Sequence, residues 1–202
     1  MIKAIVFDFG GVIELYENEG ALKSTAKLLG VPHDEFKNVY FQHNHLANVM
    51  NLDWYEMFRK VLSVFNVSTE KENEIISMVR AHHSEGKINT GLIALFPKLR
   101  QLGLKIGILS NATSELREKL NLNGIAELVD VIVISGEIGF QKPHKEAFQV
   151  LFEKLDLQPE EVIFIDDSSR SLEKASEIGY VSVLFKNNEQ LVADLKNIGI
   201  SL

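Results

Sequence analysis

The 202-residue chain contains no cysteine, which excludes disulfide bonds, thiol catalysis and metal sites built from thiolates. It also contains no segment close to the roughly 18 uninterrupted apolar residues that a membrane span requires. The apolar run at its N-terminus is broken by Asp8 and lacks the basic region and cleavage site of a signal peptide. These absences predict a protein without membrane contact that acts in the cytoplasm.

Clusters of Lys and Arg are also missing, and the net charge is -7. Because nucleic-acid binding requires clustered Lys and Arg to neutralise phosphates, we expect no nucleic-acid partner. A small phosphorylated molecule can still bind to an acidic chain if a metal ion supplies positive charge. The hydrophobic fraction of 46% and the charged fraction of 24% are typical of a globular protein.

The chain begins with an apolar run, residues 2–13, which is interrupted by a carboxylate and two glycines. Its Val and Ile residues predict a buried strand, in which Asp8 would be costly unless it lay at the end, near a cation or hydrogen-bond donors. Gly10 and Gly11 allow the backbone to turn sharply or to approach a ligand closely. Ligands bind at the carboxyl ends of the strands in open parallel sheets, so Asp8 is the first candidate for chemistry.

Residues 14–87 have a helical pattern, because apolar residues recur at three- and four-residue steps. Four helices without a strand between them are expected, at residues 22–29, 34–49, 53–65 and 69–82. A helical segment that is inserted directly after a candidate catalytic loop is well placed to cover it.

From residue 90 onward, predicted helices alternate with predicted strands. The expected helices include 92–102 and 171–178, and the expected strands are 104–109, 129–134, 161–165 and 181–185. This alternation implies an α/β fold in which a parallel, Rossmann-like sheet has helices on both faces. We therefore expect a core domain formed by residues 1–13 and 88–202, and an inserted all-α cap domain formed by residues 14–87.

Polar side chains follow three of the predicted strands: Asp8, then Ser110 and Asn111, then the pair Asp166 and Asp167. Right-handed crossovers place the carboxyl ends of parallel strands at one edge of the sheet. Adjacent carboxylates repel each other unless a cation or a proton intervenes, and oxygen ligands suit a hard ion such as Mg²⁺. Taken singly, Ser110–Asn111 could instead cap the next helix, and Asp166–Asp167 could open a turn.

Lys142 supplies a candidate cation for the same edge. It precedes Pro143, at the start of a predicted helix, where a Lys is usually a solvated surface residue. Here it follows the predicted strand at 129–134 through a glycine-containing loop. It could therefore reach the carboxylates and balance the charge of a phosphoryl group or of an aspartate intermediate.

Four motifs, at residues 7–12, 109–111, 142–143 and 165–168, together resemble the haloacid dehalogenase-like (HAD) superfamily of hydrolases with a helical cap after the first strand. The resemblance extends over the whole chain, and the motifs occur in the family's order. It implies that Asp8 is the nucleophile, which takes up a phosphoryl group as an aspartyl-phosphate.

The resemblance also implies the roles of the other motif residues. Ser110 and the backbone amide of Asn111 would hold the phosphoryl oxygens, and Lys142 would orient and neutralise the charged groups. The Mg²⁺ ion would be bound by Asp8, the backbone carbonyl of Gly10 and Asp167. Asp166 would contact the ion directly or through a water molecule.

The chain departs from the family pattern at Gly10, where phosphatases of this family usually carry a second Asp that protonates the leaving group and then activates water. General acid–base catalysis contributes roughly 10²–10⁴-fold, so an enzyme without it should be slow unless another residue substitutes. Short acidic runs are normally solvated and histidines of such helical segments are normally structural, so none of the nearby acidic and His side chains is a strong substitute. These side chains are Glu14, Glu17, Glu19, His43 and His45. A second departure is Ser171, where the last motif often has Asp or Asn.

Three functions are therefore compatible with the sequence. The first is a Mg²⁺-dependent phosphohydrolase of a small phosphorylated metabolite. The second is a dehalogenase in which Asp8 attacks a carbon that bears halide, although Asp166 and Asp167 suit a metal that such relatives do not need. The third is a binding or regulatory protein that lost turnover at Gly10.

Substrate choice depends on residues of the helical segment that face the cleft, and the candidates are Asn44, Asn48 and Trp54, although Trp54 suits the core of that segment equally well. We expect a monomer or a weak homo-oligomer.

Overall fold

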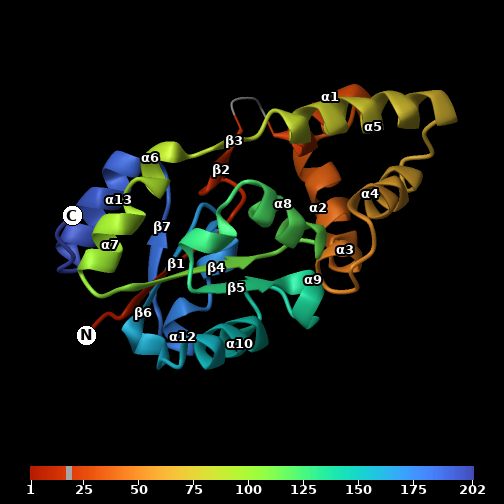
Figure 1. The fold of residues 1–202 in the computed structure, drawn as a ribbon. Coiled ribbons are helices and arrows are strands. Elements are labelled where there is room, and N and C mark those ends of the chain that lie inside the picture. The colour runs from red at the N-terminus through yellow and green to blue at the C-terminus, as the bar shows by residue number, and fades with distance from the viewer. Residues whose placement is uncertain (17–19) are drawn as a thin grey trace.

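The computed structural model describes residues 1–16 and 20–202 and is built around a parallel sheet of five strands in the order β5-β4-β1-β6-β7 (Figure 1). The strands are β1 (Ala4–Phe7), β4 (Lys105–Ser110), β5 (Val131–Ile134), β6 (Val162–Asp166) and β7 (Val181–Leu184). Phe7 pairs with Ile108 on one side and with Ile165 on the other. Asp8, which follows the central strand β1, therefore lies beside Asp166, the last residue of β6.

Alternating side chains of the strands pack against two helical layers. Ile5 and Phe7 belong to one buried cluster, whereas Ala4 and Val6 belong to another on the opposite face of the sheet. The first face is covered by α6 (Thr90–Ile93), α7 (Phe96–Gln101), α8 (Glu115–Leu122) and α13 (Asn188–Asn197). The second is covered mainly by α10 (Lys145–Leu155), with α9 (Ser135–Ile138), α11 (Ser169–Leu172) and α12 (Ala175–Ile178). This arrangement confirms the predicted α/β fold class.

The segment between β1 and the rest of the core is helical and has a buried cluster of its own. Its helices are α1 (Ala21–Leu29), α2 (His33–His43), α3 (His45–Asn48), α4 (Trp54–Ser63) and α5 (Thr69–Ser84). Phe36, Phe58 and Val61 are fully buried within it. Figure 1 shows these helices gathered at one end of the sheet, beyond α8 and α9.

Two short strands, β2 (Glu14–Leu15) and β3 (Lys87–Ile88), pair in an antiparallel manner where the chain enters and leaves this helical segment. The sequence did not predict them, because two residues are too few for an alternating pattern to be seen. The predicted boundaries of the core and cap domains fall at this pair, and the division into domains stays a prediction.

Three predicted helices are wrong in extent because each is interrupted. The helix expected at 34–49 is divided into α2 and α3 at Asn44, and the helix expected at 92–102 is divided into α6 and α7, the second of which carries Pro in its first turn. The helix expected at 171–178 consists of α11 and α12. Crossing a membrane would need a longer and more apolar helix than any in the described part of the chain.

Candidate active site

The side chains predicted to converge at the carboxyl edge of the sheet do so around Lys142. Nζ of Lys142 lies 3.0 Å from Oδ1 of Asp8 and 2.6 Å from Oδ2 of Asp166. The side chain of Lys142 is 1% exposed and that of Asp166 is fully buried. The backbone N–H of Phe9 donates a second hydrogen bond to Oδ1 of Asp8, at 2.7 Å. Lys142 is therefore a buried cation between two carboxylates, and not the solvated surface residue that its position next to Pro143 also allowed.

The side chain of Asn111 holds the backbone of Lys142 in place. Its amide donates to the carbonyl of Lys142 at 3.0 Å, and its Oδ1 accepts from the N–H of Lys142 at 2.8 Å. The sequence predicted a role for the backbone amide of Asn111 but missed this use of its side chain, because nothing in the spacing of the two residues indicates that they meet. Ser110, immediately before it, ends β4 and is almost fully buried.

Asp167 completes a group of three carboxylates. Ligand atoms of Asp8, Asp166 and Asp167 all lie within 4.8 Å of one another. Oδ1 of Asp166 also accepts from the N–H of Ser168 at 2.8 Å, so both of its oxygens have protein partners. Three carboxylates and one ammonium leave two surplus negative charges, which is the charge that a divalent cation balances. The hard oxygen donors and the close spacing fit Mg²⁺.

The pKa values of these groups indicate the same need for positive charge. Burial raises the pKa of Asp8 to about 7, although Lys142 opposes the shift. Burial and the charge of Asp166 raise the pKa of Asp167. Burial disfavours the ammonium of Lys142, but Asp8 and Asp166 outweigh this and raise its pKa. A bound cation would favour the ionised carboxylates.

Gly11 is required by close packing against Asp167. Its φ is +78°, and a Cβ atom at this position would lie 2.3 Å from Oδ2 of Asp167. Gly10 differs, because a Cβ atom there would have no heavy atom within 4 Å. The chain therefore leaves space at Gly10 for a side chain, whereas it has none at Gly11.

We expect Gly11→Ala to lower the free energy of unfolding by about 1–3 kcal/mol, because the new methyl group adds a clash to a left-handed backbone conformation. The displaced Asp167 should also weaken Mg²⁺ binding. Gly10→Ala is the matched control and should change neither property appreciably. Chemical denaturation and titration calorimetry of both variants test this pair, and equal effects of the two substitutions would contradict the packing argument.

A cavity of about 410 Å³ opens between the sheet edge and the helical segment. Its wall includes Phe9 and Asn111, which directly follow Asp8 and Ser110. Asn48, Trp54 and His83 line it from the helical segment. Asn48 and Trp54 are thus two of the three predicted cleft residues, whereas the third, Asn44, is not part of this wall.

His83 is the histidine of this cavity, and it was not among the residues predicted from the sequence. Its Nδ1 lies 3.2 Å from the hydroxyl of Tyr55, and its ring packs against that of Trp54 with centroids 4.6 Å apart. Burial lowers the pKa of His83 to about 4, with help from His82 and Lys119. Its position in the sequence gave a weak indication, because His83 lies near the end of α5, shortly before the chain returns to the sheet and its candidate site.

The candidate substitutes for the missing acid lie in different surroundings. Nδ1 of His43 lies 2.9 Å from the carbonyl oxygen of Val39 in its own helix, and His45 lines a separate cavity with Phe140 and His144. Glu14 is 3% exposed, so the expectation of a solvated acidic run is wrong at this residue. Glu17 and Glu19 lie outside the described residues.

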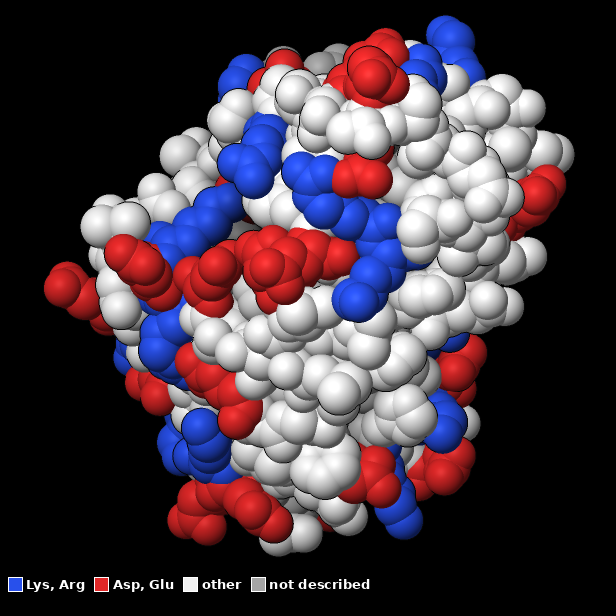
Figure 2. Space-filling model, turned by 90° about the vertical axis from the view of Figure 1, so that its right-hand side faces the viewer, with Lys and Arg blue, Asp and Glu red and all other residues white. Residues whose placement is uncertain are grey.

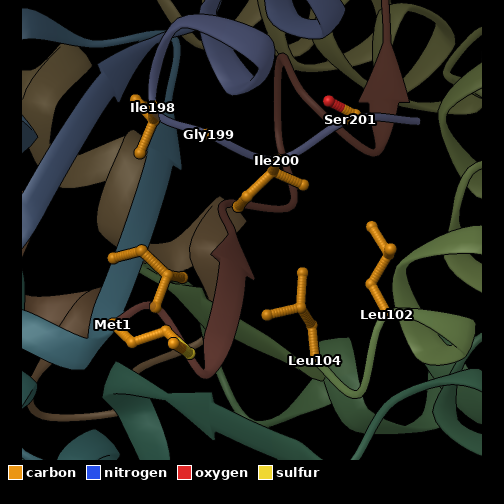
Figure 3. A pocket seen from close by; sticks show the side chains of 8 residues that line it. Met1, Leu102, Leu104, Ile198, Gly199, Ile200 and Ser201 are labelled. Atoms are coloured by element: carbon orange, nitrogen blue, oxygen red, sulfur yellow. The ribbon is translucent and has the colours of Figure 1, made fainter.

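A larger cavity, of about 580 Å³, lies at the opposite edge of the sheet. Figure 3 shows apolar side chains around it, among them Met1, Leu104 and Ile200. Met1 precedes β1 and Leu104 precedes β4, so this cavity lies at the amino ends of the strands, far from Asp8. Its place in the fold separates it from the carboxylates, in keeping with the location of ligand sites at carboxyl ends.

Comparisons with known proteins agree with this arrangement. A family model described as haloacid dehalogenase-like hydrolase matches residues 5–185. A protein of Mycobacterium tuberculosis named as a phosphatase is 27% identical over 213 residues, covering 100% of this chain and 97% of the relative. Mouse bifunctional epoxide hydrolase 2 is 21% identical over 98% of this chain, which spans only 39% of that protein's length.

A solved structure with a similar fold comes from Bacteroides thetaiotaomicron. It is an enzyme of the same family in complex with magnesium and inorganic phosphate. The TM-score is 0.63 at 20% sequence identity, and the match covers 95% of this chain and 99% of that one.

Proposed function

Because it belongs to the haloacid dehalogenase-like hydrolase family, we propose that this chain hydrolyses small phosphate monoesters with Mg²⁺, through an aspartyl-phosphate on Asp8. The observation that carries the proposal is the buried ammonium of Lys142 between Asp8 and Asp166, with Asp167 nearby. This site has a candidate nucleophilic carboxylate, a buried cation and two surplus negative charges. The name of the mycobacterial relative and the ligands of the Bacteroides structure are consistent with it.

In the proposed reaction, a carboxylate oxygen of Asp8 attacks phosphorus, and the bond from phosphorus to the leaving-group oxygen breaks. Lys142 and the backbone N–H of Phe9 both contact Oδ1 of the Asp8 carboxylate, so Oδ2 is the oxygen that would attack. The leaving oxygen takes a proton from water, since Gly10 has none to give. A water molecule then attacks phosphorus, which releases inorganic phosphate and restores the carboxylate.

Other residues of the chain hold the phosphoryl group during these steps. Ser110 and the backbone amide of Asn111 would donate to its oxygens, and Lys142 would offset their negative charge. Asp8, Asp167, the carbonyl of Gly10 and Asp166 would hold Mg²⁺. When bound, Mg²⁺ supplies positive charge beside the phosphoryl oxygens.

The helical segment, residues 14–87, would act as a cap over this site. The cavity of about 410 Å³ lies between it and the residues that follow Asp8 and Ser110, where the leaving group would bind. The expected cytoplasmic location and the monomeric or weakly associated state stay predictions.

Hydrolysis of a panel of phosphate esters, with and without Mg²⁺, tests the proposed function. Turnover that requires Mg²⁺ supports a phosphohydrolase. Metal-independent release of halide from a short haloacid would instead favour the dehalogenase. Mg²⁺ binding without turnover of any ester would favour the binding or regulatory function.

We expect Gly10→Asp to increase the rate of ester hydrolysis by roughly 10²-fold, because it restores a group that can protonate the leaving oxygen. The substitution is sterically possible, since a Cβ atom at Gly10 has no heavy atom within 4 Å. Gly10→Asn is the control, because it adds similar bulk without a titratable group. The rate constant kcat is the quantity to compare, and an equal increase in both variants would show that proton transfer is not the cause.

A further inference from the structure

The cavity beside the carboxylates contains a charged cluster that the proposed hydrolysis does not use. Nζ of Lys119 lies 2.6 Å from Oε1 of Glu14 and 2.8 Å from Oε2. The hydroxyl of Tyr16 donates to the same Oε2 at 2.6 Å. All three residues line the cavity, and the side chain of Glu14 is 4% exposed.

The cluster joins two parts of the chain, and a third part packs closely against it. Glu14 lies in β2, Lys119 lies in α8 and Gly86 directly precedes β3. A Cβ atom at Gly86 would lie 2.7 Å from the side chain of Glu14, so the Glu14 carboxylate fills the space that this glycine leaves. Its position is therefore set by the backbone and not only by its ion pair.

The charges within the cluster satisfy each other. Both oxygens of Glu14 contact the ammonium, and burial together with Glu14 raises the pKa of Tyr16, so its hydroxyl remains a donor. Lys119 is the one Lys or Arg among the described residues that line this cavity, and its charge is directed at Glu14. His83 is neutral near pH 7, because burial lowers its pKa to about 4.

A second anionic group of a substrate would therefore meet no free cation here. It would lie close to the Glu14 carboxylate, and Glu115, which is exposed at the cavity wall, adds further negative charge. Desolvating an anion beside a like charge is costly. In the upper part of the face shown in Figure 2, acidic side chains likewise lie next to basic ones.

Aromatic rings form much of the remaining wall. Phe9, Tyr40 and Trp54 line the cavity, and Nζ of Lys119 lies 5.5 Å from the centre of the Phe9 ring. Such walls suit a leaving group with an apolar face, and about 410 Å³ is a volume typical of small-molecule sites.

On the basis of the proposed function, we propose that Glu14, by neutralising Lys119, determines leaving-group specificity. The cavity would select phosphate monoesters with an uncharged leaving group over those that carry a second anionic group.

The test uses two esters that differ in this charge, meta-carboxyphenyl phosphate and its methyl ester. The wild-type protein should favour the methyl ester in kcat/KM. Glu14→Gln keeps the shape of the side chain but frees the ammonium, and we expect the ratio of the two kcat/KM values to shift about tenfold toward the carboxylate, as is usual for a hydrogen bond to a charged group. Lys119→Met leaves Glu14 without its cation and should shift the ratio the other way.

Glu137→Gln is the matched control, because Glu137 of α9 forms an ion pair with another cation of α8, Arg117, and neither residue lines this cavity. It should leave the ratio unchanged. An unchanged ratio in Glu14→Gln, or an equal loss on both esters, would overturn the inference while leaving the hydrolysis itself intact.

A second measurement compares the binding of the two esters. Titration calorimetry in the presence of Mg²⁺ gives the dissociation constant of each ester, and each substitution is made in the Asp8→Asn variant. This second readout is independent of turnover. If neither ester is hydrolysed by the wild-type protein, the proposed function fails, and the binding ratio still decides the inference. Absence of binding by both esters would also overturn it.

Discussion

Replacing Asp8 with Asn is expected to reduce Mg²⁺-dependent ester hydrolysis by on the order of 10⁴- to 10⁶-fold, the range found when an enzyme loses its nucleophile. Asn has nearly the same shape and can still accept the hydrogen bond from the N–H of Phe9. It lacks the negative charge with which Oδ2 would attack phosphorus. Steady-state hydrolysis at saturating Mg²⁺ measures the loss.

The stability of the Asp8→Asn variant separates a chemical effect from misfolding. The substitution removes one of three carboxylates whose ligand atoms lie within 4.8 Å of one another, so like-charge repulsion decreases. Without Mg²⁺, its melting temperature should therefore not fall below that of the wild-type protein. Activity of this variant within tenfold of the wild-type value would remove Asp8 from the reaction.

Replacing Lys142 with Met is expected to lower the free energy of unfolding by about 3–5 kcal/mol, the cost typical of removing one partner from a buried ion pair. The ammonium is 1% exposed and contacts Asp8 and Asp166, which would both be left as buried carboxylates without a cation. Urea denaturation measures the change. Hydrolysis should also fall sharply, since the phosphoryl oxygens lose the cation that offsets their charge.

A matched control is Lys3→Met, which breaks the ion pair with Glu161 at a site where the Lys side chain is 57% exposed. Surface pairs of this kind contribute little, so its stability should change by no more than about 1 kcal/mol. The Asp8→Asn variant provides a second control, because one of the two carboxylates is already neutral there. In this variant, Lys142→Met should lower the free energy of unfolding by less than in the wild-type protein. An equal cost in both backgrounds would contradict direct coupling between Lys142 and Asp8.

The meeting of Asp8, Asp166 and Lys142 could be predicted from the sequence because it depends on topology. Each carboxylate follows an apolar run that reads as a buried strand, and parallel strands bring their carboxyl ends to one edge. The four motifs also occur in the same order as in the family that the chain resembles, which supported this prediction. The structure places these side chains within contact distance, while their roles in catalysis stay predictions.

The cavity wall formed by Glu14, Lys119 and His83 could not be predicted in the same way. Glu14, Lys119 and His83 meet through the packing of β2, α8 and the end of α5, and no spacing in one sequence encodes such contacts. The short pairing of Glu14–Leu15 with Lys87–Ile88 that positions Glu14 has too few residues to show a period. The sequence therefore suggested a solvated Glu14 where the structure has a buried one.

The two hydrogen bonds between the side chain of Asn111 and the backbone of Lys142 could not be predicted from the sequence either, although both residues belong to motifs. The sequence indicated that both residues lie at the sheet edge. Which atoms meet depends on the path of the loop that contains Lys142, and this path is set by tertiary packing.

The central claim is that Asp8 becomes covalently phosphorylated, and rapid-quench mass spectrometry tests it most directly. The protein is mixed with an ester that it hydrolyses and Mg²⁺, quenched in acid during the first turnovers and digested. The account predicts one added phosphoryl group on the peptide that contains Asp8, dependent on Mg²⁺ and absent from Asp8→Asn. Turnover that proceeds with no phosphorylated peptide, or with the label on another residue, would contradict it.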